Sequence, residues 1–303
     1  MYCMDEQIKC LESYWTRSVE RGEKPSGVSL RDHLLTVHRT DTGFTETCAQ
    51  HCRDDEGRNT YDILADLIDP RRDDLVLDLG CGSGLLMGLC HKRYGQQIKL
   101  IGVDMSPDEL ILARRRVSGR NVRFQQALAQ DLRFIQTNSL DVVLCHWALT
   151  LMDPVDPVLD ELNRTIARGG LLGAITDGQM TSAPGYAEIH CLIYDFVQRE
   201  YPSYASFELG DPRVRSSTEL IKVVDAAFEG AAIEVSPVLL RWQASASVLA
   251  REVARFFYAT HVLSPPLRIA LIRELRALFR AQNQGEEACF SMPVNLLLVR
   301  KPT

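Results

Sequence analysis

Short apolar runs alternate with helical patterns through the middle of the chain, and this order constrains the fold more than any other feature. Apolar runs that do not alternate with polar residues are typical of parallel strands buried on both faces. The order therefore predicts a mostly parallel sheet with helices on both sides, an α/β fold. Strands are expected at residues 75–79, 98–103, 122–125, 141–145 and 171–175.

Capping signals place several of the helices between these strands. Residues 106–109, Ser-Pro-Asp-Glu, combine a serine N-cap, a proline at the first helical position and a glutamate three residues after the cap. Residues 216–219 repeat the serine and the glutamate. Residues 155–166 keep a helical spacing, and Gly169-Gly170 is expected to end that helix. Further helices are expected at residues 186–197, 249–257 and 267–279, and a last strand at 294–299.

The chain divides into an N-terminal extension and a larger α/β domain. Residues 1–56 carry two short helical patterns on either side of a polar segment at 21–29, and they lack strand signals. Residues 57–303 are expected to form the α/β domain, with helical insertions at about 181–201 and 247–282. The first fifteen residues mix acids and a lysine where a secretory signal would be apolar, so the expected location is the cytoplasm.

Composition excludes several classes of function. The chain is 46% hydrophobic and 24% charged, as in a globular protein, and no run reaches the ~18 apolar residues of a membrane helix. The net charge of −6 gives no long-range attraction to phosphate backbones or anionic lipid. We therefore expect neither a nucleic acid nor a membrane as partner.

Nine cysteines without a C-x-x-C pair indicate reduced thiols rather than a disulfide framework. Cys48, His51 and Cys52 could begin a zinc site, but no second ligand pair with matching spacing follows. Buried thiols beside a loop histidine are therefore favoured, and no metal site is expected.

A glycine-rich turn after the first strand predicts a ligand site. Asp78 is followed by Gly80, Gly82 and Gly84, which permit a tight turn and a close approach of a ligand to the backbone. The second strand ends at Asp104, twenty residues after Gly84, where an acid can accept hydrogen bonds from ribose hydroxyls. The pairing of turn and acid favours a nucleotide site over a purely structural turn.

These residues resemble the class I S-adenosylmethionine-dependent methyltransferases, whose first motif is an acid followed by G-x-G-x-G. Leu85 stands where nicotinamide-binding proteins have glycine or alanine. The resemblance covers about residues 61–177 and the closing strand. It implies a Rossmann-like, doubly wound, mostly parallel seven-stranded sheet, and S-adenosylmethionine as the cofactor. The residues it places around the methionine portion and the ribose are Asp78, Gly80, Cys81, Gly82, Asp104 and Met105.

Residues 126–132 resemble the adenine-contacting segment of that family. Leu128 stands where the family often has an aspartate that accepts the adenine amino group. The remaining candidates for adenine contacts are Ala129, Gln130 and Asp131.

The residues after the fourth strand, Cys145, His146 and Trp147, are implied to face the reactive sulfonium. His146 is a candidate catalytic base, and a histidine of the pocket wall is an equal alternative. Trp147 could place its ring against the sulfonium, although packing is the preferred interpretation.

The N-terminal extension is expected to act as a helical lid over the methyl donor. Tyr14 is its candidate catalytic residue, and Trp15, His33 and His38 are further candidates. Helices packed on the core, with solvated histidines, are the alternative for each of these residues.

Three functions remain in view at this stage. The first is methyl transfer to an O, N or C atom of a small molecule, as in natural-product methylation in secondary metabolism. The second is cyclisation of S-adenosylmethionine itself to azetidine-2-carboxylate and methylthioadenosine, which a closed pocket would suit. The third is a binding protein without catalysis. A homodimer through the C-terminal helices is left open.

Overall fold

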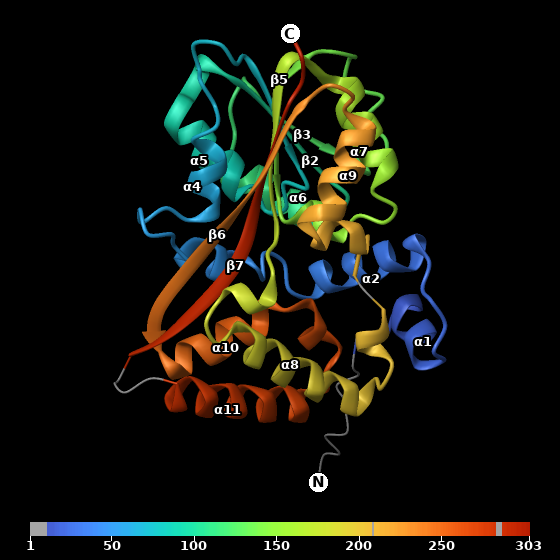
Figure 1. Cartoon of the computed structure of the whole chain (residues 1–303), viewed down its shortest axis with the longest axis vertical. Coiled ribbons are helices and arrows are strands. Elements are labelled where there is room, and N and C mark those ends of the chain that lie inside the picture. Colours follow the sequence, from blue (N-terminus) through green and yellow to red (C-terminus); the bar gives the residue numbers. More distant parts are fainter. Residues whose placement is uncertain (1–10, 208, 283–286) are drawn as a thin grey trace.

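The computed structural model describes residues 11–207, 209–282 and 287–303, and within them seven strands form one sheet in the order β3-β2-β1-β4-β5-β7-β6 (Figure 1). Strands β1 to β5 run parallel, and β7 is antiparallel to both of its neighbours. The predicted Rossmann-like α/β fold is confirmed. The strands are β1 (Leu75–Leu79), β2 (Lys99–Asp104), β3 (Val122–Gln126), β4 (Leu140–His146), β5 (Ile166–Asp177), β6 (Ala232–Ser245) and β7 (Glu287–Arg300).

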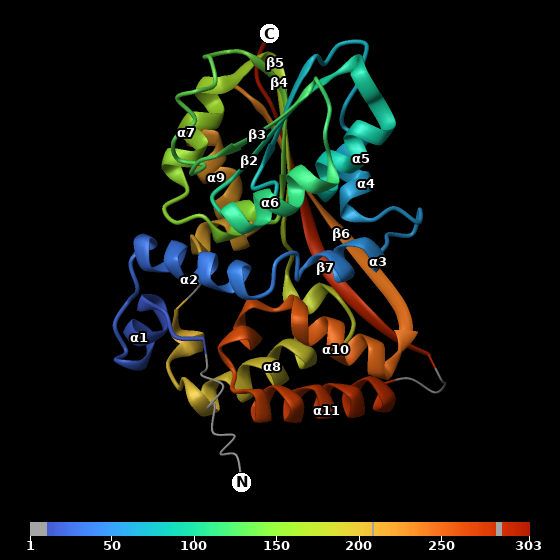
Figure 2. The ribbon, with the colours of Figure 1, turned by 180° about the vertical axis from the view of Figure 1, so that it is seen from behind.

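Helices cover both faces of this sheet (Figure 2). Helices α4, α5 and α6 lie on one face, and α7 and α9 lie on the other. Neighbouring strand residues point to opposite faces: Val76 belongs to one apolar cluster and Leu77 to the other. The bounds are α4 (Thr60–Ala65), α5 (Leu85–Tyr94), α6 (Pro107–Arg116), α7 (Asp156–Thr165) and α9 (Ser217–Ala227).

Several expected boundaries differ from the structure, and two of these differences concern a helix end and a helix start. Helix α7 ends at Thr165 rather than near Gly169, because Ile166 is fully buried and pairs with Leu140 as the first residue of β5. The polar segment at 21–29 is shorter than expected, since the helix after it begins at Gly27 behind a Ser26 N-cap.

Strand β6 is the one strand that we did not identify from the sequence. It lies at the edge of the sheet, many of its side chains are partly exposed, and it contains Pro237. Proline is tolerated at a sheet edge because no neighbouring strand needs its missing N–H.

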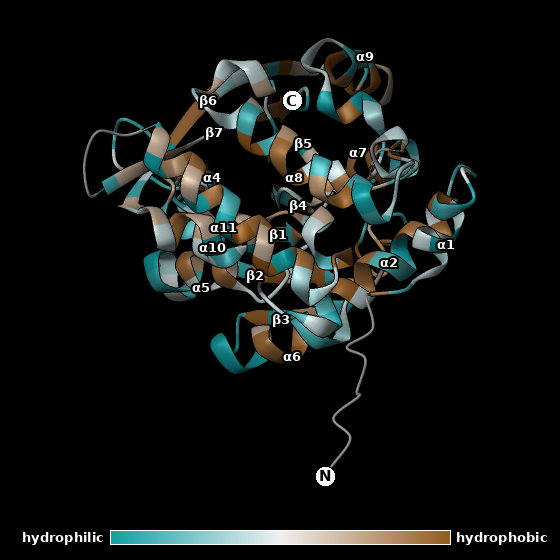
Figure 3. Cartoon of the chain, turned by 90° about the horizontal axis from the view of Figure 1, so that it is seen from below, coloured by the Kyte–Doolittle hydropathy of each residue, from teal (hydrophilic) through white to brown (hydrophobic). Residues whose placement is uncertain are grey.

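Strands β6 and β7 continue beyond β5 as a two-stranded arm. Residues 171–177 of β5 pair with residues 294–300 of β7, whereas residues 287–293 of β7 pair with β6 alone. The arm carries α10 (Ala246–Phe256) and α11 (Pro265–Ala281), which lie beside α8 (Tyr186–Glu200) below the sheet. Seen from below, these helices carry both hydrophobic and hydrophilic residues (Figure 3).

The N-terminal extension shares the main apolar core. It forms α1 (Tyr14–Glu20), α2 (Gly27–Thr40) and α3 (Glu46–His51). Trp15 and Leu34 are almost fully buried, and they belong to the same cluster as the arm helices.

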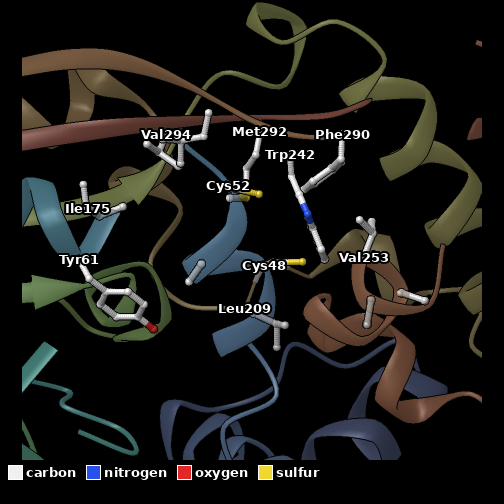
Figure 4. Packing of buried hydrophobic residues seen from close by; sticks show 14 of the residues in the cluster. Cys48, Cys52, Tyr61, Ile175, Leu209, Trp242, Val253, Phe290, Met292 and Val294 are labelled. Atoms are coloured by element: carbon white, nitrogen blue, oxygen red, sulfur yellow. The ribbon is translucent and has the colours of Figure 1, made fainter. Parts of the chain in front are cut away.

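Cys48 and Cys52 lie in the interior of that cluster. Figure 4 shows both thiols among apolar side chains that include Trp242, Met292 and Phe290. His51 stacks on Trp242 at 4.9 Å between ring centroids. Among the residues described by the structure, no group of histidine, cysteine and acidic side chains is arranged to hold a metal ion.

Candidate functional site

A cavity of about 870 Å³ lies where the carboxyl ends of the parallel strands meet the helices below the sheet. Its walls come from the glycine turn after β1, the ends of β2, β4 and β5, one face of α2, and residues of α8 and α10. Ligand sites of α/β sheets lie at this edge, where strand order reverses.

Within the described part of the chain, no helix is both long enough and apolar enough to cross a membrane.

The glycine turn leaves space on the cavity side. Gly80 has a φ of +70°, and a Cβ there would overlap the side chain of Ala148. Gly82 has a φ of +48°, and a Cβ there would meet only Oε2 of Glu109, at 3.9 Å. Gly82 therefore faces open space that a ligand can occupy, whereas Gly80 permits close packing against the loop after β4.

Asp104 holds this turn in place. Its Oδ2 accepts a hydrogen bond from the Gly82 N–H at 2.8 Å, and its Oδ1 accepts one from the Ser106 N–H at 2.8 Å. Burial raises the pKa of Asp104, against the lowering effect of these two N–H donors. The carboxylate lines the cavity and joins β2 to the turn.

Asp78 is a buried carboxyl group that lacks a partner. It is 2% exposed, it lines the cavity, and neither of its carboxylate oxygens has a hydrogen-bond partner within the described residues. Burial, with a smaller contribution from the charge of Asp104, raises the pKa of Asp78 to about 8. Such a group suits a ligand that brings a cation or a hydrogen-bond donor.

Most of the predicted cofactor residues line the cavity together. The lining includes Asp78, Gly80, Gly82 and Asp104, together with Cys81, Met105, Ala129 and Gln130.

Two predicted cofactor residues lie outside the lining. Cys145 is fully buried in the opposite apolar cluster, because alternate residues of β4 point to opposite faces of the sheet. Asp131 points away and forms an ion pair with Arg133 at 2.7 Å.

His146 lines the cavity as a neutral histidine. Its Nε2 lies 2.8 Å from the hydroxyl of Thr60, and its ring stacks on Tyr61 with 4.1 Å between centroids. Burial lowers its pKa to about 3. A weakly basic ring held in this way fits the pocket wall better than it fits a general base.

Trp147 joins the end of β4 to the arm. It has a φ of 58°, and its ring packs edge-on against His146 and against Phe256 of α10. These contacts support the packing interpretation, although the ring also lines the cavity.

One face of α2 closes the side of the cavity. Gly27, Leu30, Arg31, Leu34 and His38 line it, at the spacing of one helical face. Of the four lid candidates, His38 alone reaches the cavity within the described residues.

Tyr14, the expected catalytic residue of the extension, does not lie at the cavity. It is 66% exposed and packs against the guanidinium of Arg17. Trp15 and His33 are buried against each other, with 5.0 Å between ring centroids, and they do not line the cavity either.

Two acidic residues at the site were missed by the sequence analysis. Glu109 keeps the Ser106 cap through its N–H, but its carboxylate turns to His38 at 2.7 Å and to the Gly43 N–H at 2.9 Å. Glu46 of α3 accepts hydrogen bonds from the Ser83 hydroxyl and from Arg116. No local sequence pattern predicts these contacts, because the partners lie between 37 and 71 residues apart in the chain.

Aromatic side chains line the part of the same cavity that lies toward α8 and the arm, which we call the aromatic chamber. Tyr186, His190, Tyr194 and Phe257 contribute aromatic rings, and His190 stacks on Tyr194 at 4.2 Å. Burial lowers the pKa of His190, and the charge of Arg215 lowers it further. The chamber therefore holds a neutral imidazole among aromatic side chains.

The chamber also contains an ion pair. Arg215 binds the carboxylate of Asp177, the last residue of β5, and also donates to the carbonyl oxygen of Leu209 at 2.8 Å. Both charged side chains line the cavity.

Residues 76–170 match the family model described as a methyltransferase domain. The match covers the glycine turn, Asp104 and the loop after β4, so the fold and the site together define a Rossmann-like methyltransferase domain. The matched part of the chain, residues 76–170, is thus a methyltransferase domain of the class I S-adenosylmethionine-dependent type.

Relatives of known name resemble part of the chain. A demethylmenaquinone methyltransferase of Lactobacillus johnsonii is 30% identical over 113 residues, which are 36% of this chain and 46% of the relative. A malonyl-[acyl-carrier protein] O-methyltransferase of Acetivibrio thermocellus is 26% identical over 57% of each chain. The chain thus spans about half the length of the curated relatives that it matches.

The [4+2]-cyclase SpnF is similar in fold. Its solved structure superimposes with a TM-score of 0.56 at 19% identity, over 92% of this chain and 98% of SpnF. At this level of identity the similarity concerns the fold alone.

Proposed function

We propose that the chain is an S-adenosylmethionine-dependent enzyme that transfers a methyl group to an O, N or C atom of a small molecule. The observation that carries this proposal is that one cavity is lined on one side by the glycine turn and on another by aromatic side chains of α8 and the arm. The first side suits a nucleotide, and the second offers room for an acceptor that the nucleotide does not fill.

The residues around the glycine turn fit S-adenosylmethionine. Open space at Gly82 accommodates a ligand against the backbone, and Asp104 presents a carboxylate to ribose hydroxyls. The partnerless Asp78 suits the ammonium group of the methionine portion. When bound, S-adenosylmethionine supplies an electrophilic methyl group on a sulfonium.

The residues of the chamber suit an aromatic or largely apolar acceptor. Aromatic rings provide the binding surface, and the neutral imidazole of His190 can take up the proton of an acceptor O–H or N–H at its free ring nitrogen. We assign the role of base to His190 rather than to His146, whose pKa is about 3 and whose ring is held by Thr60.

The walls exclude water from the reacting groups. Leu34 of α2, Trp147 and Phe256 border the cavity with apolar surface. Transfer from a sulfonium depends mainly on alignment and desolvation, so a rigid apolar wall contributes directly to the rate.

Cyclisation of S-adenosylmethionine remains the alternative on the same fold. It requires no acceptor, and the aromatic chamber with its histidine and ion pair would then have no use in the reaction. The chamber is therefore the feature that favours methyl transfer.

One incubation series tests the proposal. The protein is incubated with S-adenosylmethionine alone and with a panel of phenols, aryl amines and aryl carboxylic acids, and products are identified by mass spectrometry. Acceptor-dependent S-adenosylhomocysteine supports methyl transfer. Methylthioadenosine formed without acceptor supports cyclisation, and absence of S-adenosylmethionine binding by calorimetry overturns both.

A further inference from the structure

Helix α2 lies across the cofactor side of the cavity in a defined direction. Its first residue, Gly27, touches the backbone of Asp153, because a Cβ on Gly27 would lie 2.5 Å from the Asp153 carbonyl oxygen. Near its other end, His38 contacts Glu109 at 2.7 Å. The helix therefore spans from the loop after β4 to helix α6.

The two ends of α2 border the parts of the cavity that we assign to two different parts of S-adenosylmethionine. The loop after β4 contains Ala148, which abuts Gly80. Gly80 follows Asp78 by two residues, and the proposed function places the ammonium group of the methionine portion at Asp78. Glu109 lies beside Asp104, the carboxylate assigned to the ribose hydroxyls. The charge of Glu109 helps to raise the pKa of Asp104. The beginning of α2 thus lies on the methionine side, and its end lies on the ribose side.

Arg31 is on the methionine side of α2, one turn after Gly27. Its side chain lines the cavity, and its Nη1 comes 3.8 Å from the position of a Cβ on Gly27. Among residues 11–207, 209–282 and 287–303, it forms no ion pair or hydrogen bond with any side chain or carbonyl. A guanidinium turned toward a cavity in this way is open to an anionic ligand.

The other charges of the cavity leave this role to Arg31. The cofactor side is lined by acidic residues, namely Glu46, Asp78, Asp104, Glu109 and Asp153. The other guanidinium of the lining, on Arg215, is bound to Asp177 and to the Leu209 carbonyl at the acceptor end. A carboxylate placed beside these acids would be repelled unless a cation faced it.

We propose that Arg31 binds the carboxylate of the methionine portion of S-adenosylmethionine. The inference rests on the proposed function, and it identifies a binding residue on the lid helix. Asp78 and Arg31 then recognise the two opposite charges of one amino-acid group. Binding of the cofactor also ties α2 to the cavity, so the helix that walls the site is fixed by the ligand it covers.

The test compares two ligands that differ only in the carboxylate. Binding of S-adenosylmethionine and of decarboxylated S-adenosylmethionine is measured by calorimetry for the wild type, Arg31→Gln and Arg39→Gln. Arg39 lies on the exposed face of the same helix, with its side chain 70% exposed. Thermal melting of each variant checks that it is folded.

We expect Arg31→Gln to weaken S-adenosylmethionine binding about 10- to 100-fold, the range for a charge-assisted hydrogen bond. Its affinity for the decarboxylated ligand should change less than about twofold. Arg39→Gln should match the wild type with both ligands.

Two results overturn the inference while leaving the proposed function intact. One is an Arg31→Gln variant that binds S-adenosylmethionine as tightly as the wild type. The other is an equal loss for both ligands, which would indicate a structural role. A wild type that binds neither ligand overturns the proposed function and this inference with it.

Discussion

The imidazole of His38 bridges two parts of the chain that are far apart in sequence: its Nδ1 lies 2.7 Å from Oε1 of Glu109, and its Nε2 lies 2.9 Å from the hydroxyl of Tyr258. A carboxylate only accepts hydrogen bonds, so in the neutral ring Nδ1 carries the proton and Nε2 accepts from Tyr258. The N-terminal helix α2, the core helix α6 and the arm are thereby joined at the wall of the cavity.

This bridge predicts that His38→Ala destabilises the protein and slows turnover. Loss of the imidazole leaves the buried carboxylate of Glu109 with only the Gly43 N–H, a cost of about 1–3 kcal/mol. Urea denaturation measures the free energy of unfolding, and kcat/KM reports the site. Tyr14→Phe is the matched control from the same extension and should change neither quantity, whereas an inactive Tyr14→Phe variant would restore the catalytic role first expected for Tyr14.

The open space at Gly82 predicts that Gly82→Val abolishes S-adenosylmethionine binding in a folded protein. A branched side chain would occupy the space of the ligand, and the φ of +48° adds strain of about 1–2 kcal/mol. Gly57→Val is the control, because Gly57 has a φ of +80° with nothing within 4 Å and lies on the surface. Both variants should melt at lower temperature than the wild type, but Gly57→Val should still bind S-adenosylmethionine. If both variants bind it equally well, the glycine turn at Gly82 has only a structural role.

Asp104→Ala is expected to weaken S-adenosylmethionine binding by about 1.5–3 kcal/mol, the range for hydrogen bonds to a charged group. The carboxylate orients the turn through the Gly82 N–H, so the loss combines direct contacts with disorder of the turn. Calorimetry measures the affinity. Asp131→Ala should bind like the wild type, since Asp131 pairs with Arg133 outside the cavity, and unchanged affinity of Asp104→Ala would refute the ribose assignment.

The pKa of Asp78, about 8 in the ligand-free site, predicts a pH-dependent affinity. A cationic amine beside Asp78 lowers that pKa, so binding releases a proton and becomes tighter as the pH rises from 6 to 8, by up to about tenfold per unit. Calorimetry in buffers of different ionisation enthalpy would detect the proton. Asp78→Asn should remove the dependence, and a wild type with flat affinity over this range contradicts the assignment.

Asp78 also affects the stability of the fold, and this effect changes with pH in the direction opposite to the ligand affinity. The unfolded state loses the Asp78 proton near the ordinary value of 3.8, whereas the folded state keeps it to about 8. Between these values the folded state binds more protons, so the Asp78 contribution to the free energy of unfolding falls as the pH rises.

The sequence predicted the parts of the fold and of the site that depend on local patterns. The run at 75–79 is β1 with the predicted bounds, and the glycine turn and Asp104 line one cavity. A buried strand, a tight turn and an acid at a strand end each leave a signature within a few residues.

Features that depend on distant contacts could not be predicted. Helix α1 has seven residues and buries Trp15, Thr16 and Val19, which leaves Tyr14 on the outside. No spacing in the sequence shows which face of so short a helix meets the core. The carboxylate of Glu109 was likewise read as part of a local cap, but its partner His38 is 71 residues away.

The arm formed by β6 and β7 and the helix α8 place the aromatic chamber on elements other than those that carry the glycine turn. Both strands run without interruption from the central sheet toward α10 and α11, so the arm keeps a fixed register relative to the sheet that carries the glycine turn. The aromatic residues of the chamber, in contrast, lie on α8 and at the end of α10. Exchange of these helices between homologues would therefore be a route to new acceptor preferences with the methyl-donor geometry retained.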